Sequence, residues 1–76
     1  QYTSIKTNGN IVFSATATIS TVQLASYSAT TVNTLAGAAG MIVSITNGTG
    51  KNAGQLAYWD TTNTRWSWVD SNLAVT

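Results

Sequence analysis

The first third of the chain alternates apolar and polar positions in the way expected of β-strands. The alternation covers residues 2–6, stops at Asn8-Gly9, and resumes over residues 11–20. Asn-Gly between two alternating segments is a strong hairpin signal, because both central residues of a type I′ turn take positive φ. The pattern therefore predicts a β-hairpin with a half-buried second strand. The apolar side of that strand consists of Ile11, Phe13, Ala15, Ala17 and Ile19.

The alternation weakens after residue 20 and then recovers. Two short strands are predicted at 21–25 and 29–34, followed by a loop at 36–40 where Ala and Gly interrupt the pattern. The clearest strand predictions come next, at 41–47, 55–60 and 65–69. A glycine-rich loop is expected between the first two of these strands, and a turn between the last two.

Alternation within these later strands also predicts which side chains are buried. Met41, Val43 and Ile45 share one face, which we expect to point inward. Trp66 and Trp68 share one face of the last strand, so they should be buried together or exposed together. We expect them to be buried. With 14 Thr, no Pro, and glycines confined to expected turns and loops, residues 1–76 are interpreted as a single all-β domain. The expected architecture is an antiparallel sandwich or barrel of six to seven short strands.

Charge is scarce along the whole chain. Charged residues make up 7% of the 76 positions, against about 25% in ordinary domains. No formal charge occurs between Lys6 and Lys51, and the net charge is +1. A chain with no basic stripe is a poor match for nucleic acid. Its longest nearly apolar run, residues 35–43, is far shorter than the roughly 20 residues that span a bilayer. We therefore expect neither nucleic acid nor a membrane as a partner.

The residue inventory also argues against catalysis. The chain has no His, no Cys and no Glu, so the Ser–His and Cys–His pairs of nucleophilic enzymes cannot form. Asp60 and Asp70 are its only carboxylate side chains. We expect no enzyme activity, no cofactor and no metal site. A domain of this size without disulfides or metal is marginally stable alone, which favours a homo-oligomer.

Four aromatic residues gather between residues 58 and 68, and two interpretations are open. Exposed aromatic faces could stack on sugars while neighbouring polar groups bind hydroxyls. This partner or glycan surface would comprise Trp59, Asp60, Asn63 and Arg65. Alternatively, aromatic side chains fill the core or a subunit interface. The residues assigned to that structural role are Phe13, Tyr58, Trp66 and Trp68. Residues 60–63 are expected to form a β-turn in which the Asp and Asn side chains bond the local backbone.

About half of the chain, residues 30–69, resembles a β-module that recurs in tailed-bacteriophage virion proteins, including tail-fibre and head-decoration proteins. The resemblance is carried by Thr31-Val32-Asn33-Thr34-Leu35, Ala38-Ala39-Gly40, the strand Met41–Asn47, Leu56-Ala57-Tyr58-Trp59-Asp60 and Arg65-Trp66-Ser67-Trp68-Val69. The chain departs from the module in having Thr61 where the module commonly has Gly after Asp, and Asn47 where Asp is frequent. Both changes alter turn chemistry and leave the strand pattern intact.

The resemblance implies a non-enzymatic structural role at the surface of a virion, usually as a trimer. The first hypothesis is a capsid decoration or cement protein that stabilises the head as a homotrimer bound to the major capsid protein. A second is a tail-fibre or receptor-binding module that contacts host surface glycans. A third is a secreted carbohydrate-binding module unrelated to phage.

Overall fold

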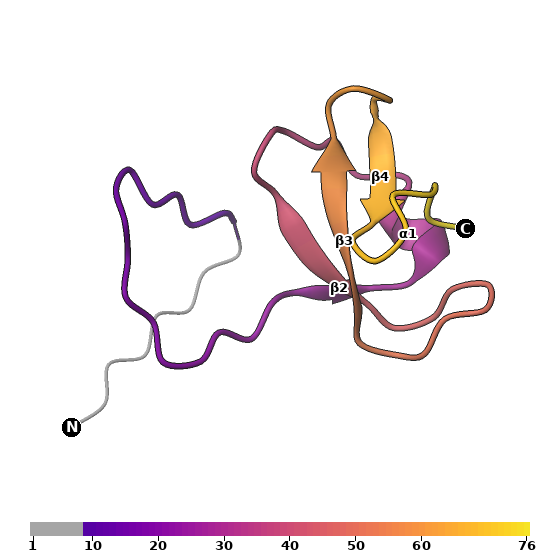
Figure 1. The fold of residues 1–76 in the computed structure, drawn as a ribbon, viewed down its shortest axis with the longest axis horizontal. Helices are drawn as coiled ribbons and strands as arrows, with labels where there is room; N and C mark the ends of the chain where they lie inside the picture. Colours follow the sequence, from indigo (N-terminus) through magenta and orange to yellow (C-terminus); the bar gives the residue numbers. More distant parts are fainter. Residues whose placement is uncertain (1–8) are drawn as a thin grey trace.

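The computed structural model describes residues 9–76, which form one four-stranded sheet and a single turn of helix (Figure 1). The elements in chain order are β1 (Ser26–Tyr27), α1 (Ala29–Val32), β2 (Ile42–Ile45), β3 (Gln55–Asp60) and β4 (Arg65–Trp68). The regular structure is mostly strand, and no long helix occurs in the described residues. This agrees with the small all-β class that the sequence predicts.

The sheet is mixed and its strands follow chain order, β1-β2-β3-β4. β2, β3 and β4 are antiparallel neighbours, as short loops between sequential strands require. β1 instead runs parallel to β2, with Ser26 opposite Ser44 and Tyr27 opposite Ile45. The connection between these two strands contains α1, as parallel pairing requires a longer crossover. The prediction of a wholly antiparallel arrangement is therefore wrong for β1.

The segment predicted as a strand at 29–34 contains the helix α1. Ser28 caps it: the backbone is extended at this residue, and its Oγ accepts a hydrogen bond from the Thr31 N–H at 3.1 Å. The helix buries Ala29 and Val32, which lie three positions apart on one helical face. The alternating Thr and Val residues favoured a strand, but the cap and the two buried contacts hold the segment in a single helical turn.

One face of the sheet, the closed face, carries the core. It packs against α1 and against residues near the C-terminus. The buried apolar residues are Ala29, Val32, Ile45, Ala57, Trp66, Trp68 and Val75. Met41 and Val43 pack against this cluster without being fully buried. The inward face predicted for β2 is therefore confirmed, with Ile45 as its most buried member.

Residues 73–75 continue the sheet beyond β4. The Trp68 N–H donates to the Leu73 carbonyl at 2.8 Å, and the Val75 N–H donates to the Trp66 carbonyl at 3.0 Å. The Asn33 side chain, just after α1, donates to the Val75 carbonyl at 2.8 Å. The C-terminal segment therefore covers the β4 edge and is tied to the helix.

The N-terminal part of the described chain leaves the sheet at β1 and follows a curved path beside it (Figure 1). No strand occurs in residues 9–25, and each residue of 9–23 is exposed. The half-buried strand predicted at 11–20 and the short strand predicted at 21–25 are therefore wrong for the single chain. The strand predicted at 2–6 and Asn8 of the predicted turn lie outside the described residues. We call residues 10–23 the arm.

Candidate interaction surface

Trp66 and Trp68 lie side by side on the closed face, and each is only 3% exposed. The prediction that they are buried together is confirmed. The Trp66 indole N–H donates to the Leu35 carbonyl at 3.2 Å, so its polar atom has a partner inside the protein. Both rings therefore belong to the core of the single chain and are not available to a ligand.

Trp59 is half-buried beside them rather than free on the surface. Its ring meets Trp66 edge-on, with centroids 5.6 Å apart and an interplanar angle of 75°. Gly37 lies directly over its indole, and a Cβ added there would overlap the ring. Because the loop before β2 covers Trp59 in this way, the indole face does not form an open stacking platform.

Strand alternation separates the four residues predicted as a partner or glycan surface. Trp59 points to the closed face, while Asp60 and Arg65 lie opposite each other on the other face of the sheet. Asn63 lies in the turn between β3 and β4. The structure therefore places the aromatic ring and the polar groups on different sides of the sheet.

Asp60 organises the turn between β3 and β4. Its Oδ1 accepts from the backbone N–H groups of Thr62 and Asn63, both at 3.1 Å. Its Oδ2 accepts from the Asn63 side chain at 2.8 Å and from the Ser67 hydroxyl at 3.0 Å. These bonds, the Asn63 side chain above all, lower the pKa of the Asp60 carboxyl. The predicted turn is confirmed for Asp60, whose side chain bonds the local backbone, whereas the Asn63 side chain binds the Asp60 carboxylate instead.

A polar cluster continues from Asp60 across the same face. The Arg65 Nε donates to the Ser67 Oγ at 3.1 Å, and its Nη2 donates to the Asn72 carbonyl at 3.1 Å. The Tyr58 hydroxyl bonds to the Asn72 Oδ1 at 2.9 Å. Tyr58 is half-buried, and its side chain lies on the face of the sheet away from the tryptophans. It therefore belongs to this polar network and not to the aromatic core.

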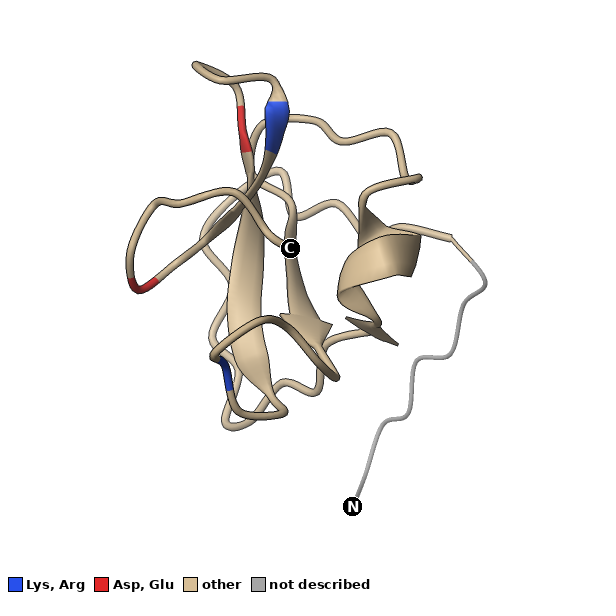
Figure 2. Cartoon of the chain, turned by 90° about the vertical axis from the view of Figure 1, so that its right-hand side faces the viewer, with Lys and Arg blue, Asp and Glu red and all other residues tan. Residues whose placement is uncertain are grey.

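The second carboxylate, Asp70, binds Lys51. The Lys51 ammonium donates to both Asp70 oxygens, at 2.7 and 2.8 Å, and lies 5.3 Å from the Trp68 ring centroid. The hydrogen bond from Lys51 lowers the pKa of Asp70. This contact ties the loop before β3 to the turn after β4. All charged residues of the described chain lie between positions 51 and 70 (Figure 2).

Comparison of the chain with protein-family models, curated proteins and solved structures found no match. Within residues 9–76, no group of three or more side chains suited to a metal ion occurs. No helix of the described part has the length and apolar character needed to cross a membrane.

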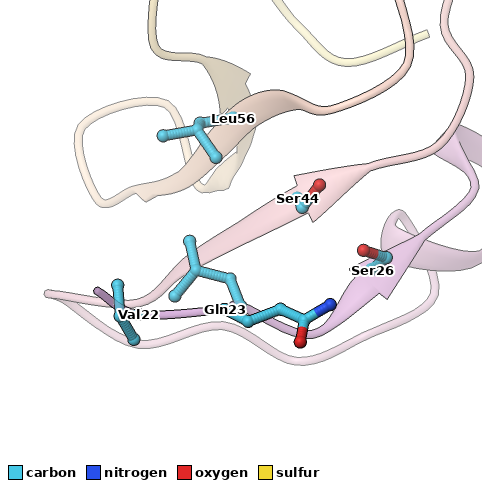
Figure 3. A pocket seen from close by; sticks show the side chains of 6 residues that line it. Val22, Gln23, Ser26, Ser44 and Leu56 are labelled. Carbon is cyan, nitrogen blue, oxygen red and sulfur yellow. The ribbon is translucent and has the colours of Figure 1, made fainter.

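The feature that the sequence interpretation missed is the second face of the sheet, the open face. Ile42 on β2, Leu56 on β3 and Val69 after β4 lie on it and are 40–48% exposed. A shallow groove runs between this face and the base of the arm (Figure 3). The residues that line it are Val22, Gln23, Leu24, Ser26, Ser44 and Leu56. None is charged, so the groove can offer apolar contact and neutral hydrogen bonds but no acid–base chemistry.

The arm carries a second set of exposed apolar side chains. Phe13 is 60% exposed, and Ile11, Val12, Ile19 and Val22 are exposed as well. The assignment of Phe13 to the aromatic core is therefore wrong for the single chain, because no part of the sheet covers it. Its assignment to a subunit interface stays a prediction. The arm and the open face together form the candidate interaction surface.

Proposed function

We propose that this chain is a non-enzymatic structural protein of a bacteriophage virion, acting as a capsid decoration or cement protein. In this proposal it assembles as a homotrimer on the major capsid protein and stabilises the head at the particle surface. The resemblance of residues 30–69 to virion modules supports the setting. The observation that carries an assembly role is the set of large apolar side chains that the single chain leaves exposed on the arm and on the open face.

The amount of exposed surface supports assembly quantitatively. A compact monomer of 7.9 kDa exposes about 4400 Å². This chain exposes 5961 Å², which is about 1500 Å² more than that expectation. A stable interface of standard size covers about 800 Å² on each partner. An excess of this order supports contact with at least one neighbouring copy.

The chemistry of the described residues supports a structural role over catalysis. Both carboxylates are engaged in bonds that hold turns together, Asp60 within its own turn and Asp70 with Lys51. A general acid or base must instead reach a substrate with an available proton or lone pair. In the proposed assembly, the second layer of the predicted sandwich comes from a neighbouring copy packed on the open face.

Location on the particle tests this function. Antibodies raised against the purified chain should label the heads of intact virions that carry this sequence, and mass measurement of the purified chain under native conditions should give a trimer. Labelling confined to the tail, together with binding of the chain to a glycan array, would replace the capsid role with a receptor-binding one. Absence of the chain from purified particles would contradict a virion role altogether.

A further inference from the structure

The loop that joins β2 to β3 contains an asparagine followed by a glycine, Asn47-Gly48, and extends beyond the strands (Figure 1). Among the asparagines that the structure describes, Asn47 alone precedes a glycine. Glycine has no Cβ, so its amide nitrogen can approach the preceding side chain without steric hindrance. We propose that Asn47 is a site of spontaneous covalent modification, in which the backbone nitrogen of Gly48 displaces the side-chain amide. This inference goes beyond the proposed function and does not depend on it.

The proposed reaction takes up one water and releases one ammonia. The Gly48 nitrogen bonds to the Asn47 Cγ, the Cγ–Nδ2 bond breaks, and ammonia leaves with the amide proton of Gly48. Water then opens the resulting cyclic succinimide at either carbonyl. Breaking the bond from Cγ to the Gly48 nitrogen gives aspartate. Breaking the bond from the main-chain carbonyl carbon to that nitrogen gives isoaspartate, whose main chain runs through Cβ and Cγ.

The Asn47 side chain has a bonded oxygen and an unbonded nitrogen. Its Oδ1 accepts from the backbone N–H of Ala29 at 3.1 Å, whereas its Nδ2 bonds to no residue of the described chain. The donor on Oδ1 stabilises the negative charge that develops there when Cγ is attacked. The Gly48 N–H donates to no backbone carbonyl of the described residues, so no such bond has to break before it reacts.

Solvent reaches the reacting atoms through an open pocket beside the loop. The residues that line it are Ala29, Thr30, Asn47, Gly48, Thr49 and Thr76. Asn47 is exposed and Gly48 is half-buried. Water and hydroxide can therefore take the amide proton of Gly48, protonate the departing nitrogen and later open the succinimide.

The two residues of the pair also make contacts that the reaction would alter. Asn47 joins the loop to the first residue of α1, and a Cβ at Gly48 would overlap the Trp68 ring. The next residue, Thr49, donates its N–H to the Thr76 carbonyl at 2.9 Å. Isoaspartate adds a carbon atom to the main chain and displaces both neighbours from these contacts. Aspartate keeps the main chain and an acceptor oxygen, so isoaspartate is the product that should loosen the fold.

Peptide mapping of the aged protein tests the site. The full chain is held folded at mildly alkaline pH, digested with an acid protease and analysed by tandem mass spectrometry. Asn52, which is exposed in the same loop and precedes Ala53, is the internal control. We expect the amide of Asn47 to be replaced by an acid at least about tenfold faster than that of Asn52, because the Ala53 methyl group raises the barrier to attack. Equal rates at the two positions would overturn the proposal.

The products separate the proposed route from direct hydrolysis of the side-chain amide. Isoaspartate forms only through the succinimide, so we expect it at position 47 together with aspartate. Asn47→Gln keeps a side-chain amide but moves its carbon out of reach of easy ring closure, and should react at least about tenfold more slowly. Aspartate without isoaspartate, or an Asn47→Gln chain that reacts as fast as the parent, would overturn the proposal.

The stability of the products tests the consequence for the fold. The isoaspartate form, separated from the parent by ion exchange, should unfold at a lower urea concentration than Asn47→Asp, which carries the same added charge on an unaltered main chain. Equal urea midpoints for these two chains would contradict the contacts assigned to the loop.

Discussion

β3 and the arm are surrounded by different amounts of protein, and that difference explains their structures. β3 lies between β2 and β4, so its backbone groups are paired on both edges and Ala57 is fully buried at its centre. The arm has no strand beside it among the described residues, and its apolar side chains are exposed. An alternating segment becomes a strand only when a neighbour supplies hydrogen-bond partners and covers one face.

The C-terminal segment, like β3, has neighbours to pair with, and so it also contrasts with the arm. Residues 73–75 are only a short segment, yet they pair with β4 and Val75 is buried. Their partners belong to the same chain, because β4 and the end of α1 lie beside them and bond their backbone. The arm would need equivalent neighbouring residues, which another subunit would supply in the proposed trimer.

The largest expected effect separates an aromatic residue of the core from one of the arm. Trp66→Ala should lower the free energy of unfolding by about 3–5 kcal/mol, since it leaves a cavity in the closed face. Phe13→Ala, measured at concentrations where the chain is monomeric, should change it by less than about 0.5 kcal/mol. Urea denaturation followed by circular dichroism measures both. Equal losses would show that the arm belongs to the same cooperative core.

Two glycines, one in the folded region and one at the start of the described chain, should respond differently to an added methyl group. Gly37→Ala should destabilise the fold by about 1–3 kcal/mol, because the new methyl group overlaps the Trp59 ring. A Cβ added at Gly9, at the start of the described chain, meets no atom within 4 Å, so Gly9→Ala should preserve the thermal midpoint. A neutral Gly37→Ala would show that the loop over Trp59 is loosely held.

The tie between α1 and the C-terminal segment has a smaller expected effect. Asn33→Ala removes the side-chain hydrogen bond to the Val75 carbonyl and should cost about 1 kcal/mol. Thr30→Ala, on the exposed side of the same helix, is the control and should be close to neutral. Chemical denaturation of the two variants, compared with the parent, checks this. An unaltered Asn33→Ala variant would mean that the β4 pairing alone holds the segment.

Lowering the pH should destabilise the folded region and have no direct effect on the arm, because the arm has no ionisable side chain. Because folding lowers the pKa of Asp60, its ionised form stabilises the native state above the pKa of the unfolded chain. That stabilisation is lost as the pH falls below about 4 and passes through the lowered pKa. Thermal midpoints measured from neutral to acidic pH should fall less steeply in Asp60→Asn than in the parent. An equal fall of the thermal midpoint with falling pH in both proteins would show that Asp60 does not contribute to the acid sensitivity.

The sequence permitted a sound prediction of β2, β3, β4 and the turn at Asp60. In those segments alternation, turn residues and buried tryptophans all indicate the same structure. α1 escaped prediction because four residues are too few to show a helical period, and the cap at Ser28 was its only local signal.

The open face escaped prediction for a different reason. β3 carries apolar side chains on both faces, so the pattern does not say which face the rest of the chain covers. The arm differs from β3 in its surroundings and not in its sequence pattern. Its alternation is as regular as that of β3, but no strand of the described chain pairs with it.

Amide hydrogen exchange along the arm distinguishes an arm that packs on another copy from an arm that stays exposed. In the parent chain, exchange at residues 10–22 should slow as the protein concentration rises from submicromolar to high micromolar, while amides of β3 stay protected throughout. This result would show that the arm finds its partner on another copy. Arm amides that exchange freely at every concentration, or that are equally protected at the lowest one, would contradict the account.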